Sequence, residues 1–178
     1  MRILYRIRQF WRSLSAQTSL LELERAHARL NPEQWELFIQ LQPGEKDHAL
    51  AMFDRLLEQG ENQPDLLMAA LLHDIGKLRY RLNPSERAMV VMAHAIKPRQ
   101  SQHWGSLPPN GWDSLPGWRK AFIVAEQHAG WGAEMARESG VSPLTETLIR
   151  EHHHPHRQEA GDVENGLLRK LWAVDNES

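Results

Sequence analysis

The chain has 178 residues, which is enough for one domain with a buried core. Its 21 basic and 23 acidic residues give a formal net charge of −2, so it has no long-range positive field and general nucleic-acid binding is disfavoured. Cysteine is absent, which excludes disulfides and thiolate metal sites, leaves His, Asp and Glu as metal ligands, and fits a cytoplasmic protein.

The hydropathy pattern predicts a soluble protein. No stretch approaches the roughly 20 apolar residues of a transmembrane helix, and the first residues lack the apolar core of a secretory signal. Residues 1–14 combine arginines and apolar side chains at helical spacing. Such a helix either packs its apolar stripe on the domain or makes peripheral contact with an anionic membrane surface, and both interpretations stay open.

Helical periodicity dominates the chain, and there is no strand alternation or hairpin turn, so the predicted fold class is all-α. Asn31-Pro32-Glu33 indicates a capped helix start, and Gly60 indicates a left-handed helix end. The first five expected helices cover residues 19–30, 31–41, 45–59, 64–74 and 83–96.

A Pro/Trp-rich insertion at residues 98–118 is predicted to be a loop, because its prolines and glycines oppose a long regular element. It carries Trp104, Trp112 and Trp118. A long aromatic insertion is either a lid over a binding site or an ordered flap whose tryptophans pack on the body. Further helices are expected over residues 118–127, 129–139, 143–153 and 166–174.

The pair His73-Asp74 closes an apolar run at residues 66–72. An imidazole beside a carboxylate at the end of a buried helix is unfavourable unless a partner compensates for the lost hydration. A lone His-Asp pair is ordinarily a surface hydrogen bond, but the apolar run argues against an exposed position. A bound metal ion is then the simplest explanation, and Gly76 is expected to let the helix end open so that both side chains reach the ion.

Further histidines and an aspartate flank this pair at long range. One helical hairpin separates His48 from the pair, and more imidazoles follow in the second half of the chain. An isolated His, an HDIGK motif, later His residues and a distant Asp together resemble the HD superfamily of metal-dependent phosphohydrolases. The metal ligands that this resemblance implies are His48, His73, Asp74, His128, His152, His153 and Asp175.

The resemblance implies a single compact helical domain of the HD type at residues 45–178, with N-terminal helices at residues 1–44 packed on it. In the branch that acts on cyclic di-GMP a Gly-Tyr-Pro signature follows the paired histidines, and the chain continues through residues 154–157 without it. That branch is therefore not expected. The histidines that match no part of the pattern are His27, His94, His103 and His156.

Imidazole and carboxylate ligands suit Mn²⁺, Fe²⁺, Co²⁺, Ni²⁺ or Zn²⁺. One ion is expected, and the histidines after residue 127 leave a second ion open. Such an ion acidifies bound water and polarises a phosphoryl oxygen, so the predicted activity is hydrolysis of a nucleotide or a similar small phosphoester. Asp74 is expected to act in catalysis as well as in metal binding.

The resemblance also implies a cation for the phosphate. Lys77 of the HDIGK motif matches a lysine that contacts phosphate in relatives, and Arg79, Arg81 and Arg150 are weaker candidates. The main alternative is a noncatalytic module that binds a nucleotide or a metal in order to sense it. Oxygenase chemistry at two iron ions and an RNA-related role are further alternatives.

Overall fold

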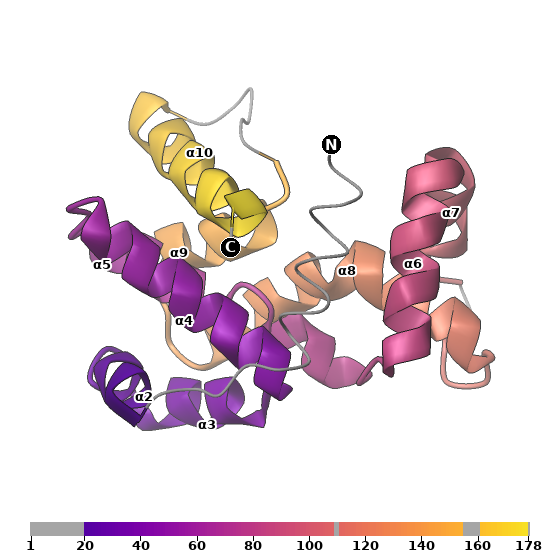
Figure 1. The fold of residues 1–178 in the computed structure, drawn as a ribbon, viewed down its shortest axis with the longest axis horizontal. Coiled ribbons are helices and arrows are strands. Elements are labelled where there is room, and N and C mark those ends of the chain that lie inside the picture. The colour runs from indigo at the N-terminus through magenta and orange to yellow at the C-terminus, as the bar shows by residue number, and fades with distance from the viewer. Residues whose placement is uncertain (1–19, 109–110, 155–160, 178) are drawn as a thin grey trace.

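The computed structural model describes residues 20–108, 111–154 and 161–177, and all regular structure within these ranges is helical. This confirms the predicted all-α class (Figure 1). Within the same ranges, no helix has the length and apolar character needed to cross a bilayer. The helices are α2 Leu20–His27, α3 Pro32–Gln40, α4 Pro43–Glu58, α5 Pro64–Leu72, the 3-10 helix η1 Ile75–Arg79, α6 Pro84–Ile96, α7 Pro98–Trp104, α8 Gly117–Glu138, α9 Pro143–Arg150 and α10 Asp162–Glu177.

Helix boundaries follow local signals in the sequence. Asn31 and Asn83 each accept a hydrogen bond from the backbone N–H three residues later, and the side chain at that position returns the bond in a capping box. Ser142 caps α9 through its hydroxyl. Gly60 and Gly140 have φ angles of 79° and 80°, the left-handed conformation that glycine adopts without strain at a helix end. The caps predicted at Asn31 and Gly60 are confirmed.

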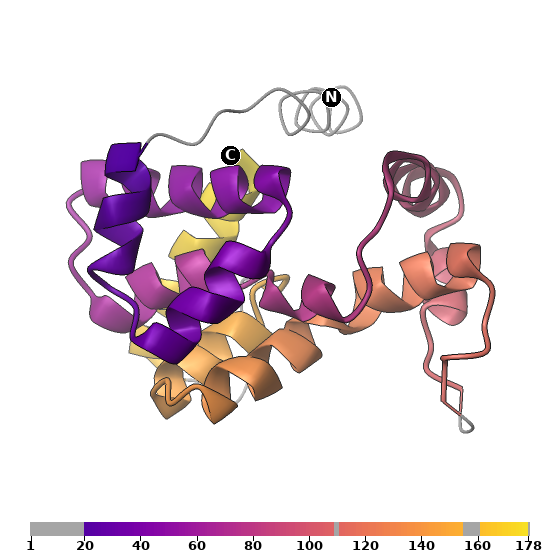
Figure 2. The same ribbon diagram turned by 90° about the horizontal axis from the view of Figure 1, so that it is seen from below.

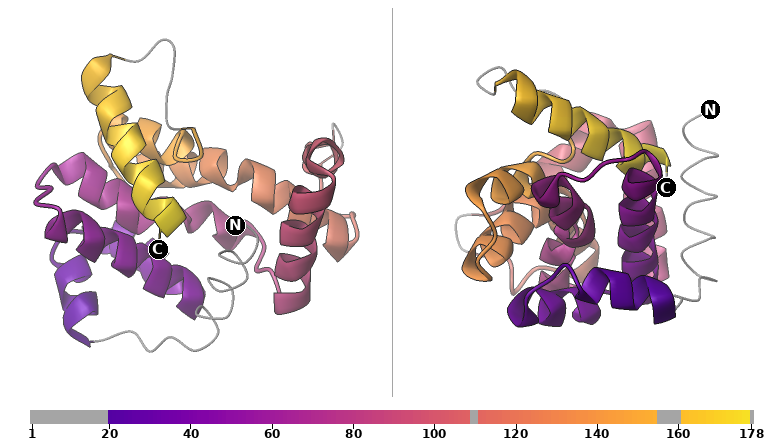
Figure 3. Two further views of the ribbon diagram at one scale, coloured as in Figure 1. Left: turned by 45° about the horizontal axis from the view of Figure 1, so that its top comes forward. Right: turned by 90° about the vertical axis from the view of Figure 1, so that its left-hand side faces the viewer.

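The main core surrounds α5, which is apolar on every side and contacts α3, α4, α9 and α10 (Figures 2 and 3). Phe38 from α3 and Phe53 from α4 belong to this core and are at most 1% exposed. Full burial of a side chain of this size stabilises the fold by roughly 1.5–3 kcal/mol. The core therefore holds α5 in place, and with it His73 and Asp74 at its end.

A second apolar cluster holds the outer lobe, which we define as α6, α7, residues 105–108 and residues 111–116. Leu82, Val90 and Phe122 are buried in this cluster, beside the N-terminal half of α8. Figure 2 shows α6 and α7 standing apart from the main body, with α8 running from one region to the other. A partly buried ion pair joins the two regions: Arg87 at the start of α6 donates to Glu45 Oε1 of α4 over 2.5 Å.

The expectation that the Pro/Trp-rich insertion is a loop throughout is wrong, because Pro98–Trp104 forms α7. Its proline stands in the first helical turn, where the missing N–H is harmless. Tertiary contacts then support the helix. The rings of Trp104 and Phe122 have centroids 5.0 Å apart, and Trp112 lies 5.0 Å from Trp131 of α8. These tryptophans pack on α8, as the ordered-flap interpretation expects.

The predicted helix break at His128 is also wrong, because Gly117–Glu138 is one continuous helix. The glycines in its second half do not interrupt it, since tertiary packing overrides their weak helix propensity. Gly76 of η1 lies so close to α8 that a Cβ there would overlap the His128 carbonyl and the Gly132 amide. Gly76 therefore serves close packing of η1 on α8 rather than the opening of a helix end.

Several helix ends differ from the prediction by a few residues. α5 ends two residues early and α9 three residues early, whereas α10 begins four residues early and continues three residues further. As a result, His73-Asp74 and His152-His153 both lie in turns that follow a helix, and Asp175 lies within α10. The N-terminal segment 1–14 and His156 lie outside the described residues.

Candidate metal centre

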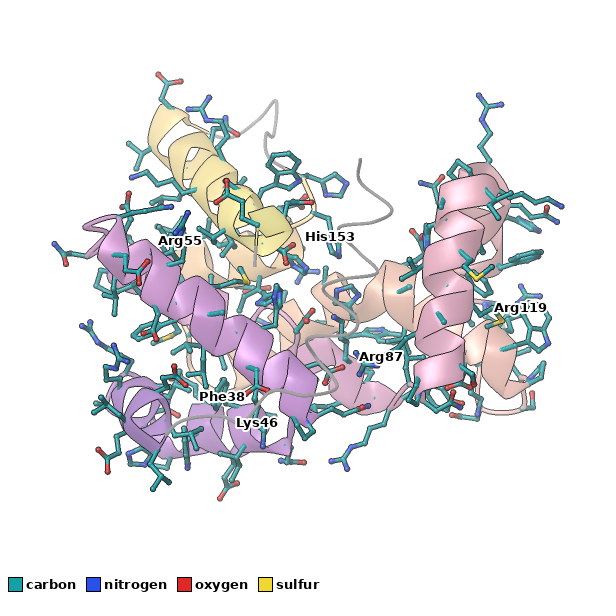
Figure 4. All side chains as sticks on the ribbon, viewed as in Figure 1. Phe38, Lys46, Arg55, Arg87, Arg119 and His153 are labelled. Carbon is teal, nitrogen blue, oxygen red and sulfur yellow. The ribbon has the colours of Figure 1, made fainter. Side chains whose placement is uncertain are left out.

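Five separate elements bring the predicted ligands together. His48 comes from α4, the pair His73-Asp74 from the end of α5, and His128 from the middle of α8. The pair His152-His153 follows α9, and Asp175 lies in the last turn of α10. Figure 4 shows His153 lying between α10 and α8. Their atoms form two adjacent groups.

The first group contains His48, His73 and Asp74, whose ligand atoms all lie within 4.8 Å of one another. His73 Nε2 lies 3.5 Å from Asp74 Oδ2. Asp175 lies against the same group, with its Oδ1 atom 2.9 Å from His48 Nε2 and 3.9 Å from His73 Nε2. Two imidazoles and two carboxylates therefore converge at this point.

The second group contains His128, His152 and His153, again with ligand atoms within 4.8 Å of one another. The Nε2 atoms of His128 and His153 are 3.2 Å apart. The rings of His152 and His153 have centroids 3.9 Å apart. Asp74 connects the two groups, because its Oδ1 atom lies 3.4 Å from His128 Nε2 while its Oδ2 atom faces His73.

Backbone carbonyls orient three of these imidazoles. His73 Nδ1 lies 3.0 Å from the Ala70 carbonyl, and His152 Nδ1 lies 2.7 Å from the Ile149 carbonyl. His128 Nδ1 lies 2.9 Å from the carbonyl of Val124, one turn back along α8. Because a carbonyl only accepts, Nδ1 is the protonated nitrogen of each neutral ring, and Nε2 presents a lone pair to the centre.

Two of these lone pairs indicate that the centre fits a metal ion. His73 Nε2 and His152 Nε2 are buried and have no hydrogen-bond partner among the described residues. A buried polar atom without a partner is unfavourable by about 1–3 kcal/mol. A divalent cation would satisfy both atoms at once, and nitrogen and carboxylate oxygen are donors that transition metals accept.

Burial keeps four of the imidazoles, those of His73, His128, His152 and His153, uncharged at neutral pH. It lowers the pKa of His73 and of His128, and desolvation followed by the field of neighbouring histidines lowers the pKa of His152 and His153 to about 4. Neutral imidazole is the form that binds a metal.

The carboxylates of the centre remain ionised although they are buried. Burial alone would raise the pKa of Asp74, but Lys77 and His73 hold it well below its usual value. Burial opposes ionisation of Asp175 too, and the hydrogen bond with His48 holds the pKa of Asp175 well below its usual value. The centre thus combines two ionised carboxylates with neutral imidazoles such as His73 and His152, a donor set that suits a divalent cation.

Of the four predicted phosphate-binding cations, the structure brings only Lys77 to the centre. Its Nζ atom lies 2.5 Å from Asp74 Oδ2, and its side chain is 24% exposed, so it stands at the rim. The three arginines interact elsewhere: Arg79 lies over Trp131 and near Glu134, Arg81 donates to the Gln40 carbonyl, and Arg150 pairs with Glu146.

Sequence reasoning missed the groups that position the ligands. The Ala70 and Ile149 carbonyls fix the tautomers of His73 and His152. No sequence signal marks a carbonyl for that role. The close approach of η1 to α8 at Gly76 and Gly132 holds Asp74 against His128. The two glycines are visible in the sequence, and only the structure pairs them.

Comparison of the chain with protein-family models, with curated proteins and with solved structures found no match. The function is therefore argued from the residues of the centre and their geometry.

Proposed function

We propose that this chain is a metal-dependent phosphohydrolase of the HD type that acts on a nucleotide or a similar small phosphoester. The observation that carries the proposal is the convergence of His48, His73, Asp74 and Asp175 with three further histidines from α8 and the turn after α9. Buried imidazoles and carboxylates from five elements do not meet without a charge to bind.

The donor set favours one or two ions among Mn²⁺, Fe²⁺, Co²⁺, Ni²⁺ and Zn²⁺. His48, His73, Asp74 and Asp175 would hold the first, and His128, His152 and His153 the second. Asp74 supports two ions, because one of its oxygens faces each group. When bound, such ions supply an acidified water and draw charge from a phosphoryl oxygen.

The protein residues supply orientation and charge. The hydrogen bonds to backbone carbonyls keep the Nε2 atoms of His73 and His152 pointing inward, so the ligands need no rearrangement. Lys77 is anchored on Asp74 at the rim, where its ammonium group would face the phosphoryl oxygens and stabilise the negative charge that develops on them. The aspartate thus acts on the ion directly and on the substrate through the lysine.

The test combines metal analysis with a hydrolysis assay. Protein purified without chelator is expected to contain a transition metal and to release phosphate from members of a nucleotide panel when Mn²⁺, Co²⁺ or Ni²⁺ is added. Asp74→Ala is expected to lose metal and to lower kcat/KM by about 10³-fold or more, because both groups lose their shared carboxylate. His103→Ala changes an exposed histidine in α7 and should leave both readouts unchanged.

The deep burial of the ligands favours a second candidate, a noncatalytic metal or nucleotide sensor. His73 and Asp74 are only 1% and 4% exposed, which suits tight ion binding and restricts access of a substrate. Tight metal or nucleotide binding with no turnover under any of the metals would support the sensor and contradict the hydrolase. Protein that binds neither a metal ion nor a nucleotide after exhaustive titration would contradict both the hydrolase and the sensor.

A further inference from the structure

The metal centre is more exposed on one side than on the others, and the exposure of its residues identifies that side. The side chains of His48 and Asp175 are 15% and 18% exposed, and Lys77 stands at the rim. The ligands that are at most 4% exposed are His73, Asp74, His128 and His152. A substrate therefore reaches the centre from the side of α4, α10 and η1.

Trp172 lies beside this open side, on the same helix as Asp175. The two residues are three positions apart in α10, so their side chains leave the helix in directions about 60° apart and about one turn from each other. Leu171 lies on the other side of Asp175 and is fully buried in the main core. Asp175 is thus placed between the buried face of α10 and Trp172, and the indole borders the opening.

Trp172 differs from the other tryptophans of the described ranges in its packing. The five that have another aromatic ring nearby, with centroids 4.7 to 5.8 Å apart, are Trp35, Trp104, Trp112, Trp118 and Trp131. The indole of Trp172 is half-buried, yet it makes no ring contact and no hydrogen bond with any other described residue, and it belongs to neither apolar cluster. Its flat face is therefore available to a ligand.

The surroundings of Trp172 favour a small planar ligand over a protein or a membrane. Its neighbours one turn before and one turn after, on the same side of α10, are Arg169 and Asn176, and both are polar and exposed. A partner protein or a membrane is bound through contiguous apolar surface. Here a single aromatic ring stands among polar side chains, which is the arrangement that stacks on one base.

We propose that Trp172 is the stacking surface for the base of the substrate, which makes that substrate a nucleotide rather than a sugar phosphate. The inference rests on the proposed phosphohydrolase function, because the metal centre beside Asp175 would hold the phosphoryl group. Every base has a π-face, so stacking on an indole distinguishes a nucleotide from a phosphoester without a base and hardly distinguishes one base from another.

A comparison of AMP with ribose 5-phosphate tests the proposal, because the two compounds share the sugar and the phosphoryl group and differ in the base. With Mn²⁺ present, Trp172→Met removes the aromatic face and is expected to raise KM for AMP about tenfold. Because stacking is made equally in the ground state and the transition state, kcat for AMP should not change. The kinetics of ribose 5-phosphate should not change either.

Two further variants separate stacking from bulk. Trp172→Phe retains an aromatic face and should keep KM for AMP within about threefold of the wild type. Trp118→Met changes a tryptophan of α8 that is 43% exposed and belongs to the outer side of the molecule, and it should leave both substrates unaffected. Metal content should be the same in all variants.

Three outcomes in active protein would overturn the proposal. These are an equal loss for AMP and ribose 5-phosphate in Trp172→Met, a Trp172→Phe variant as weak as Trp172→Met, and a loss of metal from Trp172→Met, which would mean that the indole supports Asp175 instead. If the wild type hydrolyses neither compound, the phosphohydrolase proposal fails separately. Calorimetric titration of AMP into Mn²⁺-loaded protein then decides: binding about tenfold weaker in Trp172→Met supports stacking, and equal or undetectable binding overturns it.

Discussion

The metal centre and the outer lobe are held together by opposite means. At the centre, buried polar groups face one another, and hydrogen bonds to backbone carbonyls fix the orientation of rings such as His73 and His152. In the outer lobe, Trp104 packs against Phe122 of α8, and Trp112 packs against Trp131 further along the same helix. The centre is specified by polar geometry and the lobe by apolar contact.

The two regions also differ in what a substitution should change. Loss of a polar group at the centre removes a metal ligand and leaves the remaining charged groups unbalanced. It should therefore change metal binding more than it changes the stability of the fold. Loss of apolar contact in the lobe should reduce stability and leave the ligands in place. Substitutions at the contacts between the two regions separate effects on stability from effects on metal binding.

The largest effect on stability is expected at the ion pair between the regions. Glu45 is 4% exposed and accepts from Arg87. Arg87→Met leaves the buried carboxylate with the Gln42 N–H as its remaining donor, which should lower the free energy of unfolding by about 3 kcal/mol, the low end for a buried pair, because Arg87 is 24% exposed. Urea titration measures this loss. Arg81→Met, at an exposed arginine bonded only to a carbonyl, is the control and should cost under about 1 kcal/mol. Equal losses would mean that the pair does not join the regions.

A second large effect is expected where η1 crosses α8. Gly76→Ala introduces a methyl group that overlaps the backbone of α8, and overpacking of this kind costs about 3 kcal/mol. Gly130→Ala in α8 is the control, because the nearest atom to a Cβ there is an Arg150 nitrogen at 3.8 Å. That change should be neutral or stabilise by about 0.5–1 kcal/mol through helix propensity. Thermal unfolding of both variants gives the comparison, and a tolerated Gly76→Ala would contradict the close approach.

The metal centre could be predicted from the sequence in its composition but not in its arrangement. The apolar run before His73 and Asp74 marked that pair, whereas His48 and Asp175 were selected through the resemblance to the HD pattern. The sharing of Asp74 between two groups of histidines depends on distances across five elements. No spacing rule contains those distances.

The fold shows the same division between local and tertiary signals. Caps such as Asn31 and Gly60 were predictable because they depend on a few neighbouring residues. α7 and the uninterrupted α8 were not, because prolines and glycines favour breaks locally while contacts such as Trp104 against Phe122 stabilise helix. Prediction failed where a distant partner overrides a local preference.

Acid should weaken the centre more than the lobe. The pKa of His152 is lowered to about 4, below the unfolded value of about 6.5. On acidification the unfolded chain therefore takes up this proton first. The stabilisation is complete above pH 6.5 and is lost as the pH falls towards 4, on the order of 3 kcal/mol for this group.

Urea titrations of metal-free protein between pH 7.5 and pH 4.5 measure that loss. His152→Gln should reduce the pH dependence by about one proton, whereas His103→Gln, at an exposed position, should leave it unchanged. If the free energy of unfolding changes with pH equally steeply in the wild type and in His152→Gln, the buried ring does not stay neutral in the folded chain.

The smallest effect is expected for a cation that the sequence favoured and the structure directs away from the centre. Arg150 pairs with Glu146 over 2.9 Å on the exposed side of α9, and such a pair contributes only about 0.3–0.5 kcal/mol. Arg150→Met should therefore leave phosphate release within about twofold of the wild type, whereas Lys77→Met should reduce kcat by about 10²-fold, since its ammonium stands at the rim beside Asp74. Steady-state kinetics of the two variants decide the matter. A large loss in Arg150→Met with unchanged stability would mean that the arginine leaves Glu146 to contact the substrate, and the centre would then extend across the end of α9.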